Sequence, residues 1–401
     1  MGKHQKVLII VSVLLYGFLT LFSYAYVDLN LTLSQNPLII HFVKTMQQLS
    51  YFNRPAATYI YILFVICAFV FFVYNLWLFK SDKLTLSYLR KSVILTTLIL
   101  VFAYPFLSSD LFNYLFDAKI ILKYHASPYT HRPLDFPTDE WLRFMRWVHR
   151  YSPYGPLWLT SSLIPAFLGF NKFILNFFAF KIFIGLFHLI NTYLVYKILQ
   201  KINPRLLLFG TAFYALNPLF LIEGVANSHN DVVVATSLLA TVYFLIIKRN
   251  LLSVSALVLG ALVKYISIII LPLVLVQITS KNVIKIEKTI LIILLSMGLF
   301  TFLFSSFRIT VPFVSPGATQ VQFQPWYLFW TLPLVSLLPQ WNLILISLAL
   351  SMGASLRYLP FLYFGDWSQS GTIAFMQTVL VIPVTMVIFW IILRRFLNKI
   401  K

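Results

Sequence analysis

Apolar runs of about 15 to 25 residues recur along almost the whole chain, and short polar or basic segments separate them. A helix needs about 20 apolar residues to cross a bilayer, and open strands would leave backbone groups unpaired in lipid. The pattern predicts an all-α polytopic membrane protein with about 12 transmembrane helices, some short or broken. The expected spans are 7–27, 57–79, 92–107, 174–199, 205–222, 231–247, two halves of 252–279, 289–306, 325–339, 341–357 and 372–394.

Lysine and arginine residues gather at the ends of these runs, and such clusters mark the cytoplasmic side of a membrane protein. The first run lacks a small-residue cleavage pattern, which favours a retained span over a signal peptide. We therefore expect residues 1–401 to form one integral domain of the cytoplasmic membrane, with both termini inside. The clusters are Lys3 and Lys6; Lys80, Lys83, Arg90 and Lys91; Lys197, Lys201 and Arg205; Lys248 and Arg249; Lys281, Lys285 and Lys288; and Arg394, Arg395, Lys399 and Lys401.

The run 252–279 has basic clusters on both sides, so it must cross the membrane an even number of times. Two half-length helices that meet near Lys264 and Tyr265 satisfy this condition. Each would be about 20 Å long, too short to cross alone. The alternative is one tilted span whose lysine side chain extends to the interface.

A long polar loop, 108–172, follows the third span on the outer side, and shorter outer loops are expected at 307–324 and 358–371. Within the long loop, Leu157 to Phe170 is apolar but short, and it contains Pro165. If this segment crossed, the basic cluster that begins at Lys197 would lie outside. We expect a juxtamembrane helix along the outer surface instead.

The composition supports the membrane assignment and excludes several other classes. Hydrophobic residues make up 60% of the chain and charged residues only 10%. The net charge of +20 comes from clusters at the ends of spans rather than from one basic face, so no nucleic acid partner is expected. The single cysteine, Cys67, excludes an intramolecular disulfide and a cysteine-ligated cluster. No histidine has metal-ligand spacing, and no metal or cofactor is expected.

The acidic residues are distributed unevenly between the two sides. Of the eleven Asp and Glu residues, only Asp82 and Glu287 fall on the cytoplasmic side in this topology. Acidic residues barely affect topology, so the asymmetry is independent of how the spans were oriented. Chemistry that needs a carboxylate should therefore face outward. The outer acids are Asp28, Asp110, Asp117, Asp135, Asp139, Glu140, Glu223, Asp231 and Asp366.

Asp110 is the strongest candidate, because it stands just beyond the third span in SSDLFNYLFDAKI. Asp117 follows seven residues later and would share its helical face, with Tyr114 beside both. The alternative is that Asp110 caps a helix that begins at Leu111.

Two other motifs carry polar or aromatic groups on the outer side. The turn SHND contains His229, Asn230 and Asp231, which are more polar groups than a helix cap needs, although Asn230 or Asp231 could cap the next helix. The segment YSPYGPLW contains Tyr154 in a rigid turn that could either line a site or anchor the chain at the interface.

These motifs resemble the GT-C superfamily of membrane glycosyltransferases. Within it, the similarity is to the polyprenol-phosphate-mannose-dependent mannosyltransferases of prokaryotes and their eukaryotic glycolipid-anchor relatives. Matching stretches are Asp110, Tyr114 and Asp117 followed by Ser127, Pro128 and Tyr129; YSPYGPLW; the His229, Asn230 and Asp231 turn; GALVKY; and QPWYLFW at 324–330. The chain differs in having two spans ahead of the Asp110 loop, where many members have one. Asp110 also lacks the acidic neighbour of metal-dependent members.

The resemblance implies an inverting transfer of a hexose, most simply mannose, from a polyprenyl-phosphate donor to a hydroxyl of a glycan or glycolipid on the outer face. Asp110 would be the general base, and Lys264 and Arg308 would bind the donor phosphate. Membrane lipids would surround the protein. The sugar and acceptor would contact Tyr114, Asp117, Tyr154, His229, Asn230, Asp231 and Trp326.

Two other classes remain open at this point. A polytopic transporter or lipid-linked sugar flippase also uses broken helices, but it would place charges near the midplane and show two related halves. A polysaccharide polymerase or ligase would have its large outer loop late in the chain.

Overall fold

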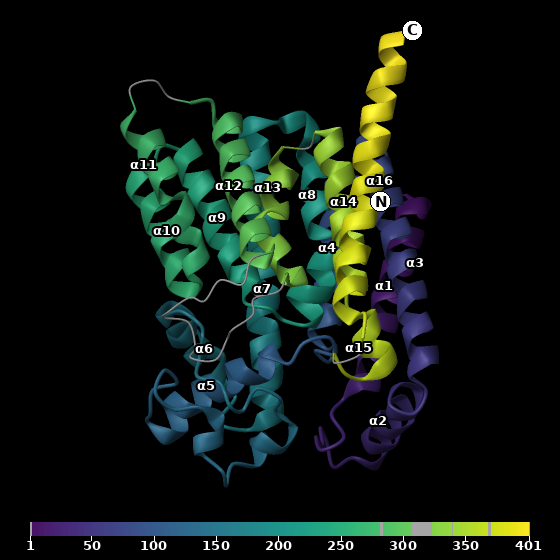
Figure 1. Cartoon of the computed structure of the whole chain (residues 1–401), viewed down its shortest axis with the longest axis vertical. Helices are drawn as coiled ribbons and strands as arrows, with labels where there is room; N and C mark the ends of the chain where they lie inside the picture. Colours follow the sequence, from purple (N-terminus) through teal and green to yellow (C-terminus); the bar gives the residue numbers. More distant parts are fainter. Residues whose placement is uncertain (1, 281–283, 307–322, 339, 368–369, 401) are drawn as a thin grey trace.

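The computed structural model describes residues 2–280, 284–306, 323–338, 340–367 and 370–400. Helices dominate these residues, which contain no β-strand, and pack side by side in one bundle (Figure 1). Six helices of the described chain are long and apolar enough to cross a membrane, which indicates a membrane protein. They are Lys3–Tyr26, Arg54–Lys80, Phe173–Ile202, Ile286–Leu303, Trp341–Phe364 and Thr372–Arg394.

The first four helices form the N-terminal side of the bundle. Helices α1 (Lys3–Ser23) and α4 (Leu86–Val101) pack closely against each other, and α3 (Arg54–Lys80) continues the layer. The sequence pattern missed α2 (Pro37–Ser50), a helix that Asn36 caps by accepting a hydrogen bond from the Leu38 N–H. A short 3-10 turn, η1 (Tyr24–Tyr26), contacts α2 and joins α1 to it.

The segment 108–172 forms a cap at one end of the bundle, opposite the C-terminal end of α11 (Figure 1). It contains α5 (Asp110–Tyr124), η2 (Pro133–Asp135), η3 (Glu140–Phe144) and α6 (Pro156–Leu168). Helix α6 has 13 residues, or about 20 Å at 1.5 Å per residue. It is too short to cross a bilayer by itself, and it packs against α5 and α7.

The predicted span 205–222 is wrong as a continuous helix. After α7 (Phe173–Ile202) and η4 (Pro204–Leu206), α8 (Leu207–Ala215) ends before Pro218. The chain then forms a π-helix, η5 (Phe220–Ala226), and the two pieces are bent by 57°. A proline cannot donate the helical hydrogen bond, which explains the break. The π-helix leads into the SHND turn, where Ser228 adopts the left-handed conformation with φ 61°.

The region 252–279 is divided near Lys264, as the charge pattern predicted. Helix α9 (Asp231–Ile246) leads to α10 (Asn250–Val263), Lys264 is extended, and the chain continues through η6 (Tyr265–Ile270) and α11 (Leu271–Thr279). Helix α10 contacts α9, η6 and α11, and Figure 1 shows α10 and α11 side by side. The chain therefore reverses at Lys264, and one long tilted helix is excluded.

A second predicted span, 325–339, is also not a continuous helix. Residues 325–339, predicted as one span, form the short η7 (Pro325–Trp330) and α13 (Leu332–Leu337) instead. Pro333 lies at the start of α13 and separates the two pieces. Around them lie α12 (Ile286–Ser306), α14 (Trp341–Leu356), α15 (Leu359–Phe364) and α16 (Thr372–Ile400). The predicted count of about 12 transmembrane helices, some short or broken, is not reached by full-length spans, because only six helices of the described residues are long and apolar enough to cross alone.

The placement of α6 makes a topological prediction. In a protein with Cys67 replaced by serine, Asn171→Cys should react with a membrane-impermeant maleimide added outside intact cells, because Asn171 follows a helix that is too short to cross alone. A cysteine at Ser81, beside the predicted cytoplasmic cluster, is the matched control and should react only after permeabilisation. Labelling of residue 171 from the cytoplasmic side alone would show that α6 crosses.

Candidate functional site

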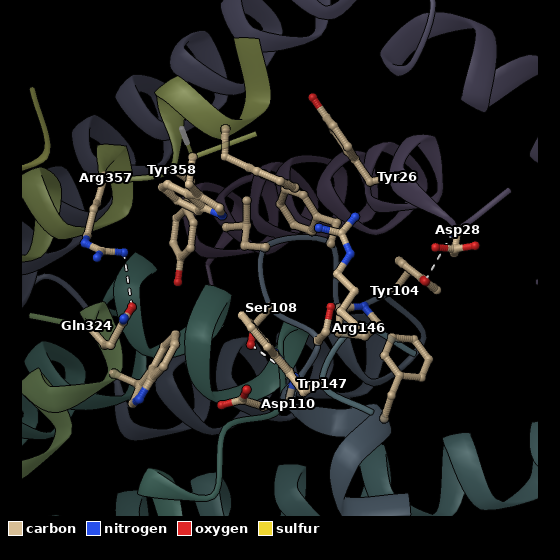
Figure 2. Close-up of a pocket in the computed structure, with 18 of the residues that line it drawn as sticks. Tyr26, Asp28, Tyr104, Ser108, Asp110, Arg146, Trp147, Gln324, Arg357 and Tyr358 are labelled. Carbon is tan, nitrogen blue, oxygen red and sulfur yellow. Dashed lines mark hydrogen bonds between the residues drawn. The ribbon is translucent and has the colours of Figure 1, made fainter. Parts of the chain in front are cut away.

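A cavity of about 300 Å³ lies where the segment after α4 meets the ends of α1, η3, η7 and α14. Asp110, Ser108 and Tyr358 form part of its wall (Figure 2). Trp326 also lines it. Arg146 and Arg357 also line it. The cavity therefore brings one predicted base next to cationic and aromatic side chains from distant parts of the chain.

Asp110 belongs to a row of three ionisable side chains. His229 Nδ1 lies 3.4 Å from Asp110 Oδ2, and His229 Nε2 lies 3.2 Å from Glu223 Oε2. His229 and Glu223 are fully buried, whereas the Asp110 side chain is 22% exposed. The His229 ring stacks on Trp326, with ring centroids 3.8 Å apart. This arrangement holds the Asp110 carboxylate at the edge of the cavity.

Contacts within this row favour the ionised forms of both His229 and Asp110. Burial opposes charging of His229, but contacts with Asp110 and Glu223 outweigh it and raise the pKa of His229 to about 9. Burial also opposes ionisation of Asp110, but His229, Lys264 and Arg150 together lower the pKa of Asp110. Asp110 is therefore a carboxylate at neutral pH, able to accept a proton.

The capping alternatives are wrong for both motifs. Helix α5 begins at Asp110, with Ser109 at its N-cap, and the Asp110 carboxylate makes no capping bond, whereas the Ser108 hydroxyl accepts a hydrogen bond from the Asp110 N–H at 3.2 Å. Helix α9 begins at Asp231, with Asn230 at its N-cap, again without a side-chain capping bond. The polar groups of both turns therefore make other contacts or, in the case of Asn230 and His229, leave buried side-chain atoms without a hydrogen bond of normal geometry. Such buried groups are unusual in folded proteins and require an explanation.

Asp231 and Lys264 form a buried ion pair next to this row. Lys264 Nζ donates to both carboxylate oxygens of Asp231, at 2.9 and 2.8 Å. Trp330 Nε1 donates a further hydrogen bond of 2.8 Å to Asp231 Oδ1. The Asp231 side chain is 1% exposed and that of Lys264 is 24% exposed. The charge of Lys264 is therefore already balanced inside the protein, and Lys264 does not line the cavity.

Aromatic side chains connect the α5 helix to the SHND turn and to YSPYGPLW. The Asn230 N–H donates to the Tyr114 hydroxyl at 3.3 Å, and the Tyr114 ring packs edge-on against Tyr154 at 5.0 Å. The Gly155 N–H donates to the Val263 carbonyl, just before Lys264. A Cβ at Gly155 would clash with the Leu262 backbone, so the close approach requires glycine.

One predicted residue, Asp117, lies apart from this arrangement. Asp117 is buried about two turns further along α5 than Asp110 and leaves one carboxylate oxygen without a hydrogen-bond partner. Burial raises the pKa of Asp117 to about 7, although a hydrogen bond from Ser152 opposes the shift. Arg308 lies outside the described residues. Within those residues, no group of three His, Cys, Asp or Glu side chains is arranged to hold a metal ion.

The sequence did not single out Glu223, Arg146 or Arg357. Glu223 could have been noticed as an acid inside an otherwise apolar stretch, where a charge is costly. Arg357 could have been noticed as a lone cation at the outer end of a span, against the usual charge bias. Arg146 is one of several basic residues in the long loop, and nothing in the sequence distinguishes it.

The raised pKa of His229 predicts a pH-dependent stability. Its value of about 9 exceeds the usual 6.5, so the stabilisation is fully present below pH 6.5 and is lost as pH rises through about 9. The thermal unfolding temperature of the purified protein should fall across this window. In His229→Gln the fall should be smaller, because the titrating group is gone. An identical fall in the variant would assign the effect to other residues.

Comparison with known families supplies one match. A family model described as Alpha-(1->6)-mannopyranosyltransferase, N-terminal domain, matches residues 9–280. The matched region contains Asp110, Glu223, His229, Asp231 and Lys264, whereas Trp326 and Arg357 follow it. No curated protein and no solved structure matches the chain.

Proposed function

Because the chain belongs to the alpha-(1->6)-mannopyranosyltransferase N-terminal domain family, we propose that it moves mannose from a polyprenyl-phosphate donor to an acceptor hydroxyl. Family membership supports mannosyl transfer and a GT-C-type enzyme. The lipid-linked donor, the acceptor class and the residues that act are the proposal. We place the reaction on the outer side of the cytoplasmic membrane, in one membrane domain with both termini inside.

The observation that carries the proposal is the position of Asp110. Its carboxylate borders a cavity of about 300 Å³, is paired with His229, and stands at the membrane end of the cap formed by 108–172. A hydroxyl that attacks an anomeric carbon must lose its proton, and a carboxylate within reach can accept it. The neighbouring aromatic rings of Trp326 and Tyr358 provide apolar walls suited to a sugar.

The proposed step is a single displacement. The acceptor oxygen forms a bond to the anomeric carbon of mannose while the bond from that carbon to the phosphate oxygen breaks. The electron pair of the broken bond stays on the polyprenyl phosphate, and the acceptor proton moves to Asp110. Attack from the face opposite the leaving group inverts the anomeric centre. Cations beside the cavity stabilise the charge that develops on the phosphate.

A direct assay tests this function. The purified full-length protein is mixed with polyprenyl-phosphate-[³H]mannose and a panel of glycan and glycolipid acceptors. We expect acceptor-dependent release of polyprenyl phosphate and a product of inverted anomeric configuration. Transbilayer movement of the donor in vesicles, without cleavage of the mannosyl bond, would support the flippase alternative and contradict the proposal.

A further inference from the structure

The cavity beside Asp110 is lined by two guanidinium groups, of which Arg146 lies inside the residues matched by the family model and Arg357 lies beyond them. Arg146 follows η3 in the cap, and Arg357 is the C-terminal capping residue of α14. Both line the cavity together with Asp110. Figure 2 shows them reaching the cavity from different elements, with Asp110 on the lower side of the view.

Arg357 is buried without a carboxylate partner among the described residues. It is 5% exposed, and its Nη1 donates a 3.1 Å hydrogen bond to the neutral side chain of Gln324. Its guanidinium also lies 5.7 Å from the centre of the Trp367 ring. A buried cation is costly unless a counter-charge balances it. Guanidinium groups bind phosphate through two parallel hydrogen bonds, so an anion in the cavity would supply that balance.

Arg146 adds a second positive charge on the cavity wall. Its guanidinium lies 5.1 Å from the centre of the Phe361 ring, and no carboxylate of the described chain pairs with it. Three lysines at this end of the molecule are paired with carboxylates. Lys264 binds Asp231, and Lys119 and Lys123 both contact Asp139. The cavity arginines are therefore better placed to receive an anion than Lys264.

The rest of the wall suits a hydrocarbon chain. Phe361 and Trp367 near α15, and Ile373 and Met376 of α16, border the cavity. Ile373 is 55% exposed and Trp367 is 42% exposed, and α16 is mostly uncovered along its length. An apolar chain attached to an anion in the cavity could leave past these side chains toward the lipid.

We propose that Arg357 and Arg146 bind the phosphate of the lipid-linked donor, and that its prenyl chain leaves the cavity beside α15 and α16. This assignment rests on the proposed function. It moves phosphate binding from Lys264 to residues outside or at the edge of the recognised motifs, and it gives the part of the chain after residue 280 a role in donor binding.

Binding of farnesyl phosphate to the purified full-length protein tests the site without requiring transfer. Arg357→Gln should weaken binding and raise the KM for the polyprenyl-phosphate-mannose donor at least about tenfold, because a charge-assisted bidentate contact is lost. Arg146→Gln, at an exposed position that tolerates substitution, should have the same sign of effect. Farnesol should bind equally to parent and variants, and inorganic phosphate should compete only weakly.

The matched control is Arg143→Gln, an arginine of the same loop whose side chain is 64% exposed and points to Glu140. It should leave both the farnesyl phosphate Kd and the donor KM unchanged. Unchanged values in Arg357→Gln and Arg146→Gln, with active parent protein, would overturn the assignment. Arginine-dependent binding of farnesyl phosphate without any mannosyl transfer would support the assignment while contradicting the proposed function.

Discussion

Asp110→Asn should reduce mannosyl transfer at least about 10²-fold, the lower range for removal of a general base. The amide has the shape of the carboxylate but cannot accept the acceptor's proton at neutral pH. Folding and donor binding should remain largely intact, because Asp110 forms no capping hydrogen bond and Glu223 still contacts His229. The measurement is the initial rate at saturating donor, with donor binding measured separately.

Asp117→Asn is the matched control for this experiment. Asp117 lies on the same helix but is buried away from the cavity. Because its pKa of about 7 leaves the carboxyl about half protonated at neutral pH, and because it does not line the cavity, the rate should change much less in the amide variant. Equal activity of Asp110→Asn and the parent, at matched expression, would remove Asp110 from the mechanism and make Asp231 the next candidate for the base.

The division at Lys264 could be predicted because it depends on a rule that acts along the chain. Basic clusters on both sides of 252–279 require an even number of crossings, and the helix does end at Val263. The break at Pro218 and the short elements at 325–337 were harder to predict. Hydrophobicity alone cannot distinguish a continuous span from two buried pieces, since both are equally apolar.

Part of the candidate site could also be predicted from positions along the chain. Asp110, His229 and Asp231 stand at the ends of apolar runs, where polar residues are conspicuous. Which of them contact each other depends on packing between distant helices, and the sequence does not encode that visibly. It therefore gave no indication that His229 would lie between Asp110 and Glu223, or that Asp231 would neutralise Lys264.

Lys264→Met should lower the free energy of unfolding by about 3 kcal/mol, the lower end for breaking a buried ion pair. The reason is that Asp231 remains buried and charged, with only the Trp330 indole left as a side-chain hydrogen-bond donor to it among the described residues. Methionine keeps most of the length of lysine, so packing changes little. Thermal and denaturant unfolding of the purified protein in detergent measure the effect.

The double variant Lys264→Met with Asp231→Asn separates a structural role of Lys264 from phosphate binding. If the ion pair is structural, replacing both charges should recover most of the stability lost in Lys264→Met, because no buried charge is left unbalanced. The farnesyl phosphate affinity should then stay within about twofold of the parent, since the tenfold loss expected for a phosphate contact would be absent. If Lys264 instead binds the donor phosphate, the double variant should regain stability but bind farnesyl phosphate at least about tenfold more weakly than the parent. That result would return phosphate binding to the Lys264 turn and leave Arg357 with a structural role at the end of α14.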